Sequence, residues 1–328
     1  MNIVYIPDRE FFISLLSDLF TMVTGIYFWV GFSVFVVFML VLDLGVFHRK
    51  SHRVPVKEAV IWSAVWISLA MVFMTIIYFD EGKIKALEFL TGYVIEYSLS
   101  VDNIFVFILI FSFFAVDEKY QHKVLFWGII GAIIMRAIFI FAGIALIRKF
   151  HWIIFIFGGF LIFTGIRMLF QGEVKVEPEK NPVVRFFRKF LPVSDKSEGD
   201  RFFVSSNGRR FATPLFIVLI IIESSDLIFA VDSIPAILAI SEDPFIVFTS
   251  NIFAIMGLRS LYFAISGIMK YFRFLKIGLA FVLAFVGLKM VVSGFDIDIP
   301  ILLSLLVITG IISVSVIASL MVKKPSGD

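Results

Sequence analysis

The sequence contains no cysteine among its 328 residues and only four histidines. The lack of cysteine excludes disulfides, iron–sulfur clusters and thiolate metal sites. Also missing are a Walker A motif, an HExxH motif and a glycine-rich phosphate loop, which argues against an ATP-driven pump and a metalloprotease. Because no nucleophile–base pair is evident either, we expect that the protein is not an enzyme and carries no prosthetic group.

Hydrophobic residues make up most of the chain. They account for 60% of it, Phe alone occurs 42 times, and the mean hydropathy is +1.01. The apolar residues come in runs of about twenty, the length that crosses roughly 30 Å of hydrocarbon as a helix. The sequence therefore predicts an all-α membrane protein with about nine transmembrane helices after a short interfacial helix. The predicted spans are 26–47, 59–79, 87–114, 124–147, 152–170, 214–240, 245–268, 275–292 and 300–322.

The predicted spans divide the chain into five segments. In order, these are an N-terminal segment with two transmembrane helices, a first three-helix repeat, a cytoplasmic loop, a second three-helix repeat, and a last transmembrane helix with a cytoplasmic tail. Their bounds are 1–86, 87–170, 171–213, 214–292 and 293–328. Within the loop, "NPVVRFFRKFL" is typical of an interfacial amphipathic segment, and "RFFVSSNGRRF" carries the Asn-Gly turn of a β-hairpin. Both stretches also fit a solvated linker.

The basic residues orient the predicted spans. With the spans as drawn, 20 of the 29 Lys and Arg residues fall in connections on one side of the membrane and five on the other. By the positive-inside rule, the side with 20 is cytoplasmic. This predicts a multi-pass protein of the bacterial inner membrane with the N-terminus outside and the C-terminus in the cytoplasm.

Three consecutive spans recur later in the chain. The stretch at 96–103 matches the stretch at 226–233, and the two following spans match in the same order. The corresponding pairs are Glu96 with Asp226, Asp102 with Asp232, Asn103 with Ser233, Arg136 with Arg259, and Gly165 with Gly287. In the predicted topology the matched spans cross the membrane in opposite directions. The sequence therefore predicts two inverted three-helix repeats, the architecture of many secondary transporters, whose sites lie at the midplane between the repeats.

Carboxylates inside the matched spans are the candidate functional groups, because a carboxylate within a bilayer costs several kcal/mol. On a regular helix, residue 103 shares a face with residue 96, while residue 102 points about 100° away. Local unwinding at 98–100, or near Pro235, would let all of these side chains converge. The predicted ligands are all oxygen donors, which suit hard divalent cations such as Mn²⁺, Ca²⁺ or Mg²⁺. They are Glu96, Asp102, Asn103, Asp226, Asp232 and Ser233, with Glu223 one turn before Asp226.

The charges at this site need compensation. Four carboxylates around one dication leave an excess of negative charge, which protons or the neighbouring Arg136 and Arg259 would balance, so proton exchange for the metal is expected. As an alternative, the intramembrane acids only pair with these two arginines and hold the bundle together. Asp43, near a cytoplasmic helix end, fits a capping residue as well as a gate residue.

At these residues the sequence resembles the TerC family of bacterial integral membrane proteins, in its longer Alx-like branch. The resembling blocks cover most of 36–292 and include "LDLGVFHRK", "LTGYVIEYSLSVDNIFVF", "FGGFLIFTGIRML" and "ATPLFIVLIIIESSDLIFAVDSIPAILAI". The family is associated with manganese homeostasis, mainly efflux. The resemblance therefore implies Mn²⁺ export, with Glu96, Asp102, Asn103, Asp226 and Asp232 at its acidic motif positions.

The sequence leaves two rival functions open. One is a Ca²⁺/H⁺ exchanger, which oxygen ligands do not distinguish from a manganese exporter. The other is a membrane scaffold or partner subunit in tellurium or stress resistance. The expected partners are a divalent cation, protons and the lipid bilayer; no nucleic-acid partner is expected.

Overall fold

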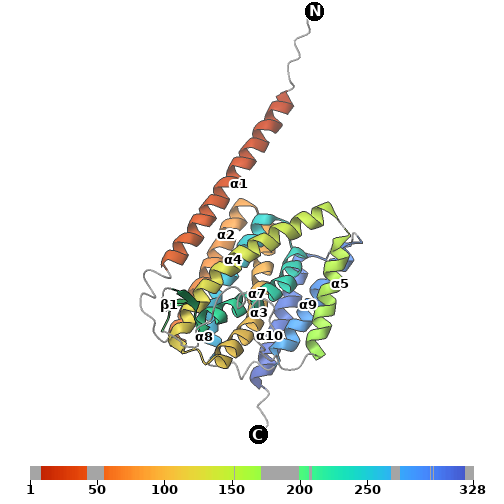
Figure 1. The fold of residues 1–328 in the computed structure, drawn as a ribbon. Coiled ribbons are helices and arrows are strands. Elements are labelled where there is room, and N and C mark those ends of the chain that lie inside the picture. Colours follow the sequence, from red (N-terminus) through yellow and green to blue (C-terminus); the bar gives the residue numbers. More distant parts are fainter. Residues whose placement is uncertain are drawn as a thin grey trace, which may run out of the picture. The chain divides into compact units, whose positions relative to one another are not determined.

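A computed structural model describes residues 9–42, 55–150, 152–170, 199–206, 209–266, 274–295, 297 and 299–321. These residues form nine helices and one two-stranded hairpin (Figure 1). The helices are α1 (Arg9–Leu42), α2 (Val56–Asp80), α3 (Lys83–Phe113), α4 (Glu118–Lys149), α5 (Ile153–Phe170), α7 (Pro214–Leu238), α8 (Pro244–Ser266), α9 (Leu275–Ser293) and α10 (Ile301–Met321).

The predicted all-α membrane fold is confirmed. Within the described residues, the helices from α2 to α10 give eight candidate membrane spans by length and hydropathy. The first predicted span falls on α1, which runs without a break from Arg9, so the separate interfacial helix predicted before it is wrong. The apolar part of α1 is Ile26–Leu42. The chain divides into two units, Met1–Ser51 and His52–Asp328, and the second contains all the helices discussed below.

The helix contacts of the second unit relate its two halves. α5 packs along α9, α3 along α8, and α4 along α7. If α3, α4 and α5 correspond to α7, α8 and α9, then the α3–α8 pair corresponds to α7–α4, and the α5–α9 pair to itself. This is the contact pattern that a two-fold relation between inverted repeats would produce. α2 covers α3 and α8, and α10 packs on α3 and α9.

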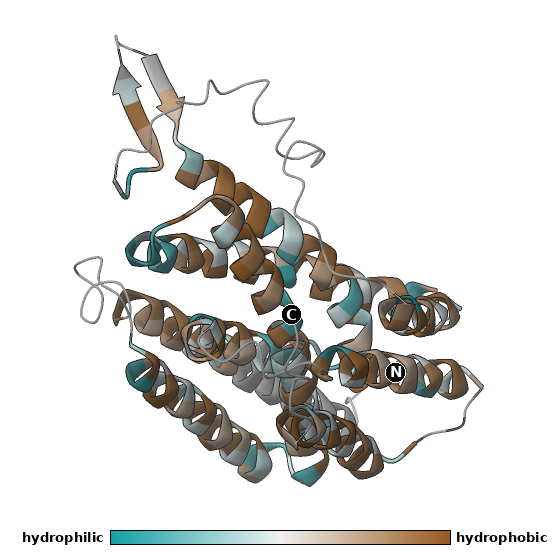
Figure 2. Ribbon diagram, turned by 90° about the horizontal axis from the view of Figure 1, so that it is seen from below, coloured by the Kyte–Doolittle hydropathy of each residue, from teal (hydrophilic) through white to brown (hydrophobic). Residues whose placement is uncertain are grey.

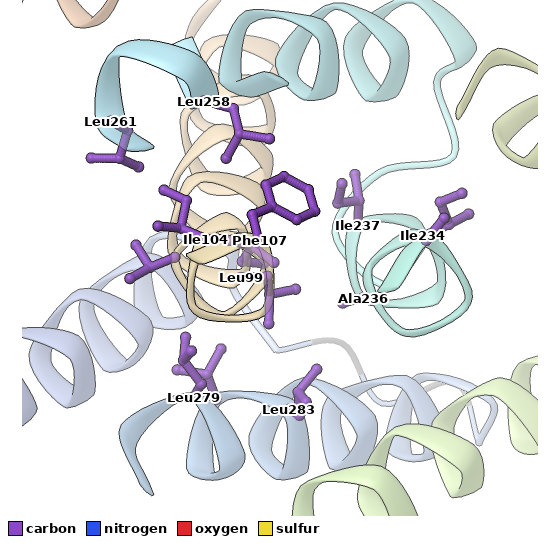
Figure 3. Packing of buried hydrophobic residues seen from close by; sticks show 14 of the residues in the cluster. Leu99, Ile104, Phe107, Ile234, Ala236, Ile237, Leu258, Leu261, Leu279 and Leu283 are labelled. Atoms are coloured by element: carbon purple, nitrogen blue, oxygen red, sulfur yellow. The ribbon is translucent and has the colours of Figure 1, made fainter. Parts of the chain in front are cut away.

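Apolar side chains fill the space between these helices. Phe107 of α3 faces Ile237 of α7 (Figure 3), and both are at most 3% exposed. Brown, hydrophobic ribbon predominates along the clearly visible helices in Figure 2, and teal marks shorter stretches of them. Because lipid is as apolar as such a core, close packing rather than exclusion from water holds these helices together.

Glycines let α5 and α9 approach closely. A Cβ added to Gly158 would lie 2.8 Å from the carbonyl oxygen of Gly287, and one added to Gly287 would lie 2.6 Å from that of Gly158. Further along, a Cβ on Gly165 would lie 2.6 Å from the carbonyl oxygen of Ala280. The two backbones therefore touch, as in small-residue packing of membrane helices.

Polar groups define several helix starts. Thr213 caps α7 by accepting from the Phe216 amide, with Pro214 in the first turn. Asp243 accepts from the amides of Phe245 and Ile246 at the start of α8. Asp117 caps α4, and its hydrogen bond to the Lys119 ammonium lowers the pKa of Asp117 below its usual value.

Part of the predicted loop has regular structure. Strands β1 (Phe203–Ser206) and β2 (Arg209–Ala212) pair antiparallel with Phe203 opposite Ala212, which confirms the hairpin predicted from the Asn-Gly turn. The segment "NPVVRFFRKFL", predicted to be interfacial, lies outside the described residues.

Replacing Ala115 by glycine should stabilise the protein. Ala115 lies between α3 and α4 with φ of 47°, a left-handed conformation that costs an L-residue with a side chain about 1 kcal/mol. Glycine adopts this conformation without that cost, although it loses more backbone freedom on folding. We expect a gain of up to about 0.5 kcal/mol, measured by thermal unfolding in detergent. A loss of stability would contradict the left-handed assignment.

Candidate functional site

Helices α3 and α7 carry the matched motifs and place them side by side. Asn103 of α3 donates a hydrogen bond of 3.3 Å to Asp226 Oδ1 of α7. Glu96, two turns earlier on α3, lies beside Ser233, two turns later on α7. The helices are therefore antiparallel at this point, with Glu96 facing the hydroxyl of Ser233 and Asp226 facing the amide of Asn103.

A buried arginine joins the two carboxylates. Arg136 of α4 places Nη1 2.8 Å from Glu96 Oε1, and the same nitrogen donates to Ser233 Oγ at 2.5 Å. Its Nη2 lies 3.7 Å from Asp226 Oδ1. Glu96 is 0% exposed, Arg136 1% and Asp226 4%, so the ion pairs are shielded from solvent. Arg136, predicted to be a counter-charge, is thus in direct contact with the predicted ligands Glu96 and Ser233.

A residue that sequence reasoning missed completes this group. Asn251 of α8 is 0% exposed and donates 3.1 Å from Nδ2 to Glu96 Oε2. Its Oδ1 and Asp226 Oδ2 are buried and accept no hydrogen bond from the described residues. The signal in the sequence was the polar run Thr249, Ser250 and Asn251 inside an apolar span. We call Glu96, Asn103, Arg136, Asp226, Ser233 and Asn251 the arginine-centred group.

The other two motif aspartates point elsewhere. Asp232 Oδ1 accepts a hydrogen bond of 3.3 Å from Thr164 of α5, a second residue that was not predicted from the sequence. Asp102 lies close enough to Lys276 of α9 and to Asp232 to interact with both electrostatically. Both aspartates are only partly buried, unlike Glu96 and Asp226. We call Asp102 and Asp232 the aspartate pair.

The expected convergence of all the acids on one point is therefore wrong for the described residues. α3 is continuous through 98–100, and α7 continues through Pro235 to Leu238, so neither helix unwinds at the site. Residue 102 consequently keeps its angle of about 100° from residues 96 and 103. No group of three or more Asp, Glu or His side chains in the described part of the chain is arranged to hold a metal ion.

Glu223 lies beside the arginine-centred group. It lines a small pocket together with Asp226, Arg259 and Gly128. The Glu223 carboxylate occupies the space beside Gly131 of α4, where a Cβ atom would collide with it. Arg259, the other predicted counter-charge, thus lies near Glu223 and Asp226. Asp43 lies outside the described residues.

Comparison with known proteins assigns the chain to a family. The family model described as "Integral membrane protein TerC family" matches residues 81–326. The chain belongs to the TerC family. The sequence resemblance is thereby confirmed, and the chain is an integral, multi-pass membrane protein.

TerC relatives match along nearly their whole length. The "Uncharacterized membrane protein STKORF319" of Myxococcus xanthus is 51% identical over 302 residues, which cover 92% of this chain and 94% of the relative. The "Putative membrane-bound redox modulator Alx" of Escherichia coli K12 is 47% identical over 293 residues, 87% of this chain and 91% of the relative. No solved structure matches.

Proposed function

We propose that this TerC protein is a secondary transporter of the bacterial inner membrane that exports a divalent cation, with Mn²⁺ as the first candidate, in exchange for protons. One observation carries the proposal. Glu96 and Asp226, from corresponding positions of the two halves, are buried at the same arginine in the middle of their helices. Because ionisable groups inside membrane helices are expensive, such groups by default mark an ion or substrate pathway.

The arrangement of the halves supports alternating access. Asn103 donates to Asp226, and Ser233 lies beside Glu96. Because Asn103 corresponds to Ser233 and Asp226 to Glu96 in the repeat, these two contacts are equivalent under the relation between the halves. In transporters built from inverted repeats, the two access states arise when such halves exchange conformations around a central site. The cytoplasmic side in this proposal is the side of the β-hairpin.

The donor chemistry supports a hard cation. Carboxylate, amide and hydroxyl oxygens are the metal-ligand atoms available in the arginine-centred group. Asp226 Oδ2 and Asn251 Oδ1 are buried there, and no described residue donates a hydrogen bond to either oxygen. Mn²⁺ and Ca²⁺ accept such oxygens. The less buried aspartate pair provides two further carboxylates, which we assign to the entry and exit of the cation.

The printed name of the Alx relatives points to redox modulation instead. This chain contains no cysteine, so thiol–disulfide exchange is not open to it. Export of a metal ion accounts for the buried carboxylates, whereas redox modulation by itself gives them no role.

The proposal is tested by cation flux into proteoliposomes that contain the purified protein and a trapped pH dye. Mn²⁺, Ca²⁺, Mg²⁺ and Zn²⁺ are offered in turn to the wild type, to Asp102→Asn and Asp232→Asn, and to Asp80→Asn as a control. Asp80 is an exposed acid at the end of α2, and its replacement should leave flux unchanged. We expect Mn²⁺ flux with opposite proton movement, and a fall to the background of protein-free vesicles in Asp102→Asn and Asp232→Asn.

The other outcomes separate the rivals. Preferred flux of Ca²⁺ would assign the protein as a Ca²⁺/H⁺ exchanger. If no cation is transported by folded wild-type protein, the transporter proposal fails and the scaffold function, in which the carboxylates only hold helices together, is favoured.

A further inference from the structure

Arg136 contacts the same oxygens that a transported cation would need. Its guanidinium lies 2.8 Å from Glu96 Oε1 and 3.7 Å from Asp226 Oδ1, and it donates to Ser233 Oγ. It therefore interacts with one carboxylate from each half of the protein and with a motif hydroxyl. A cation bound between Glu96 and Asp226 would stand where the positive charge of the guanidinium stands.

The charges do not allow both occupants together. Glu96, Asp226 and Arg136 carry a formal net charge of minus one when all three are ionised. A dication added beside the guanidinium would bring like charges within a few ångströms in a buried site, where screening by water is weak. If the guanidinium withdraws, the two carboxylates and the dication are neutral together.

Each of the two carboxylates also has a hydrogen-bond donor other than Arg136. Asn103 donates to Asp226 Oδ1, and Asn251 donates to Glu96 Oε2. Both donors are neutral amides on other helices, so they still orient the carboxylates when the guanidinium moves. Arg136 also does not use all of its hydrogen-bond donors. Its Nε is buried without an acceptor among the described residues, and its Nη2 lies farther from Asp226 Oδ1 than a hydrogen bond allows.

We propose that Arg136 is a tethered competitor of the transported dication: guanidinium and metal are alternative partners of Glu96 and Asp226, and the return of Arg136 drives release of the metal. This inference rests on the proposed transport function. In this role Arg136 lowers the affinity of the site for the dication. An arginine that only holds the bundle together would leave that affinity unchanged, or raise it by ordering the carboxylates.

The test is equilibrium binding of Mn²⁺ to purified protein in detergent, followed by the electron paramagnetic resonance signal of free Mn²⁺. The variants are Arg136→Gln, Arg136→Lys, and Arg148→Gln as a control. Arg148 lies on the same helix, is exposed, and donates a hydrogen bond to the backbone oxygen of Glu242. All variants are first checked for thermal unfolding and for a single peak in size-exclusion chromatography.

Removal of the competing charge should tighten binding. We expect Arg136→Gln to bind Mn²⁺ about tenfold more tightly than the wild type, or better, and to release it more slowly, so that flux in proteoliposomes falls. Arg136→Lys, whose single ammonium cannot reach all three oxygens, should bind about threefold more tightly. Arg148→Gln should bind as the wild type does.

Each other result is decisive. If Arg136→Gln is folded and binds Mn²⁺ no more tightly than the wild type, the competitor role is overturned while the transport proposal stands. If Arg136→Gln does not fold, the Lys variant decides, and unchanged or weaker binding in that variant overturns the role. If no protein, including the wild type, binds Mn²⁺, the proposed function itself fails and this inference fails with it.

Discussion

Replacing Gly158 by alanine should destabilise the protein by about 1–3 kcal/mol, because the added methyl group overpacks the α5–α9 contact. A Cβ at this position would lie 2.6 Å from Val291 Cγ2 and 2.8 Å from the Gly287 carbonyl oxygen. The second of these atoms belongs to the backbone, so relief requires the two helices to separate. The measurement is thermal or denaturant unfolding in detergent.

Gly159 provides the matched control. It is the next residue on the same helix, and a Cβ added there would meet nothing within 4 Å. Gly159→Ala should be neutral or stabilising by up to about 1 kcal/mol, because alanine is the better helix former. Equal effects of the two substitutions would show that α5 and α9 do not touch at Gly158.

Replacing Arg136 by methionine should be the most destabilising of the changes considered, at about 3–5 kcal/mol, the cost typical of removing one partner from a buried ion pair. Glu96 and Asp226, which are almost fully buried, would then lose the guanidinium that pairs with both of them. The measurement is unfolding at neutral pH in buffer that contains a chelator, so that no metal ion replaces the guanidinium.

A second substitution should recover much of that loss. In Arg136→Met combined with Glu96→Leu, Asp226 is the one charge of these three that remains, and Asn103 still donates to it. We therefore expect the double variant to be more stable than Arg136→Met alone, since replacing both partners of a buried pair by apolar residues is often tolerated. If the double variant loses as much unfolding free energy as Arg136→Met and Glu96→Leu lose separately when added together, Arg136 and Glu96 are not coupled.

The spans could be predicted because apolar length alone sets them. The expectation of 59–79 corresponds to Val56–Asp80, and that of 245–268 to Pro244–Ser266. Where α1 begins could not be predicted in this way, since the residues before 26 mix acids with apolar side chains and lack a twenty-residue run. Composition gives the length of a membrane helix but not the position where a helix extends beyond the membrane.

The site was predicted less completely, for a local reason. Unwinding at 98–100 was one way in which Asp102 could have reached the other acids, but Ser98 Oγ donates to the Val94 carbonyl oxygen one turn earlier. Such a bond satisfies the hydroxyl within the helix, so the helix continues and Asp102 is turned away from Glu96. Asn251 and Thr164 escaped notice because their roles depend on contacts between helices distant in sequence. The repeat did not reveal Asn251 either, since its counterpart in the first half is Gly128.

The hydrogen bonds to the two buried carboxylates cross between the halves of the chain. Glu96 belongs to the first half and receives its amide donor from Asn251 in the second, while Asp226 of the second half receives its donor from Asn103 in the first. Neither half alone can satisfy its own carboxylate in the same way. Formation of the polar centre therefore requires the segments on both sides of 171–213 to be in place.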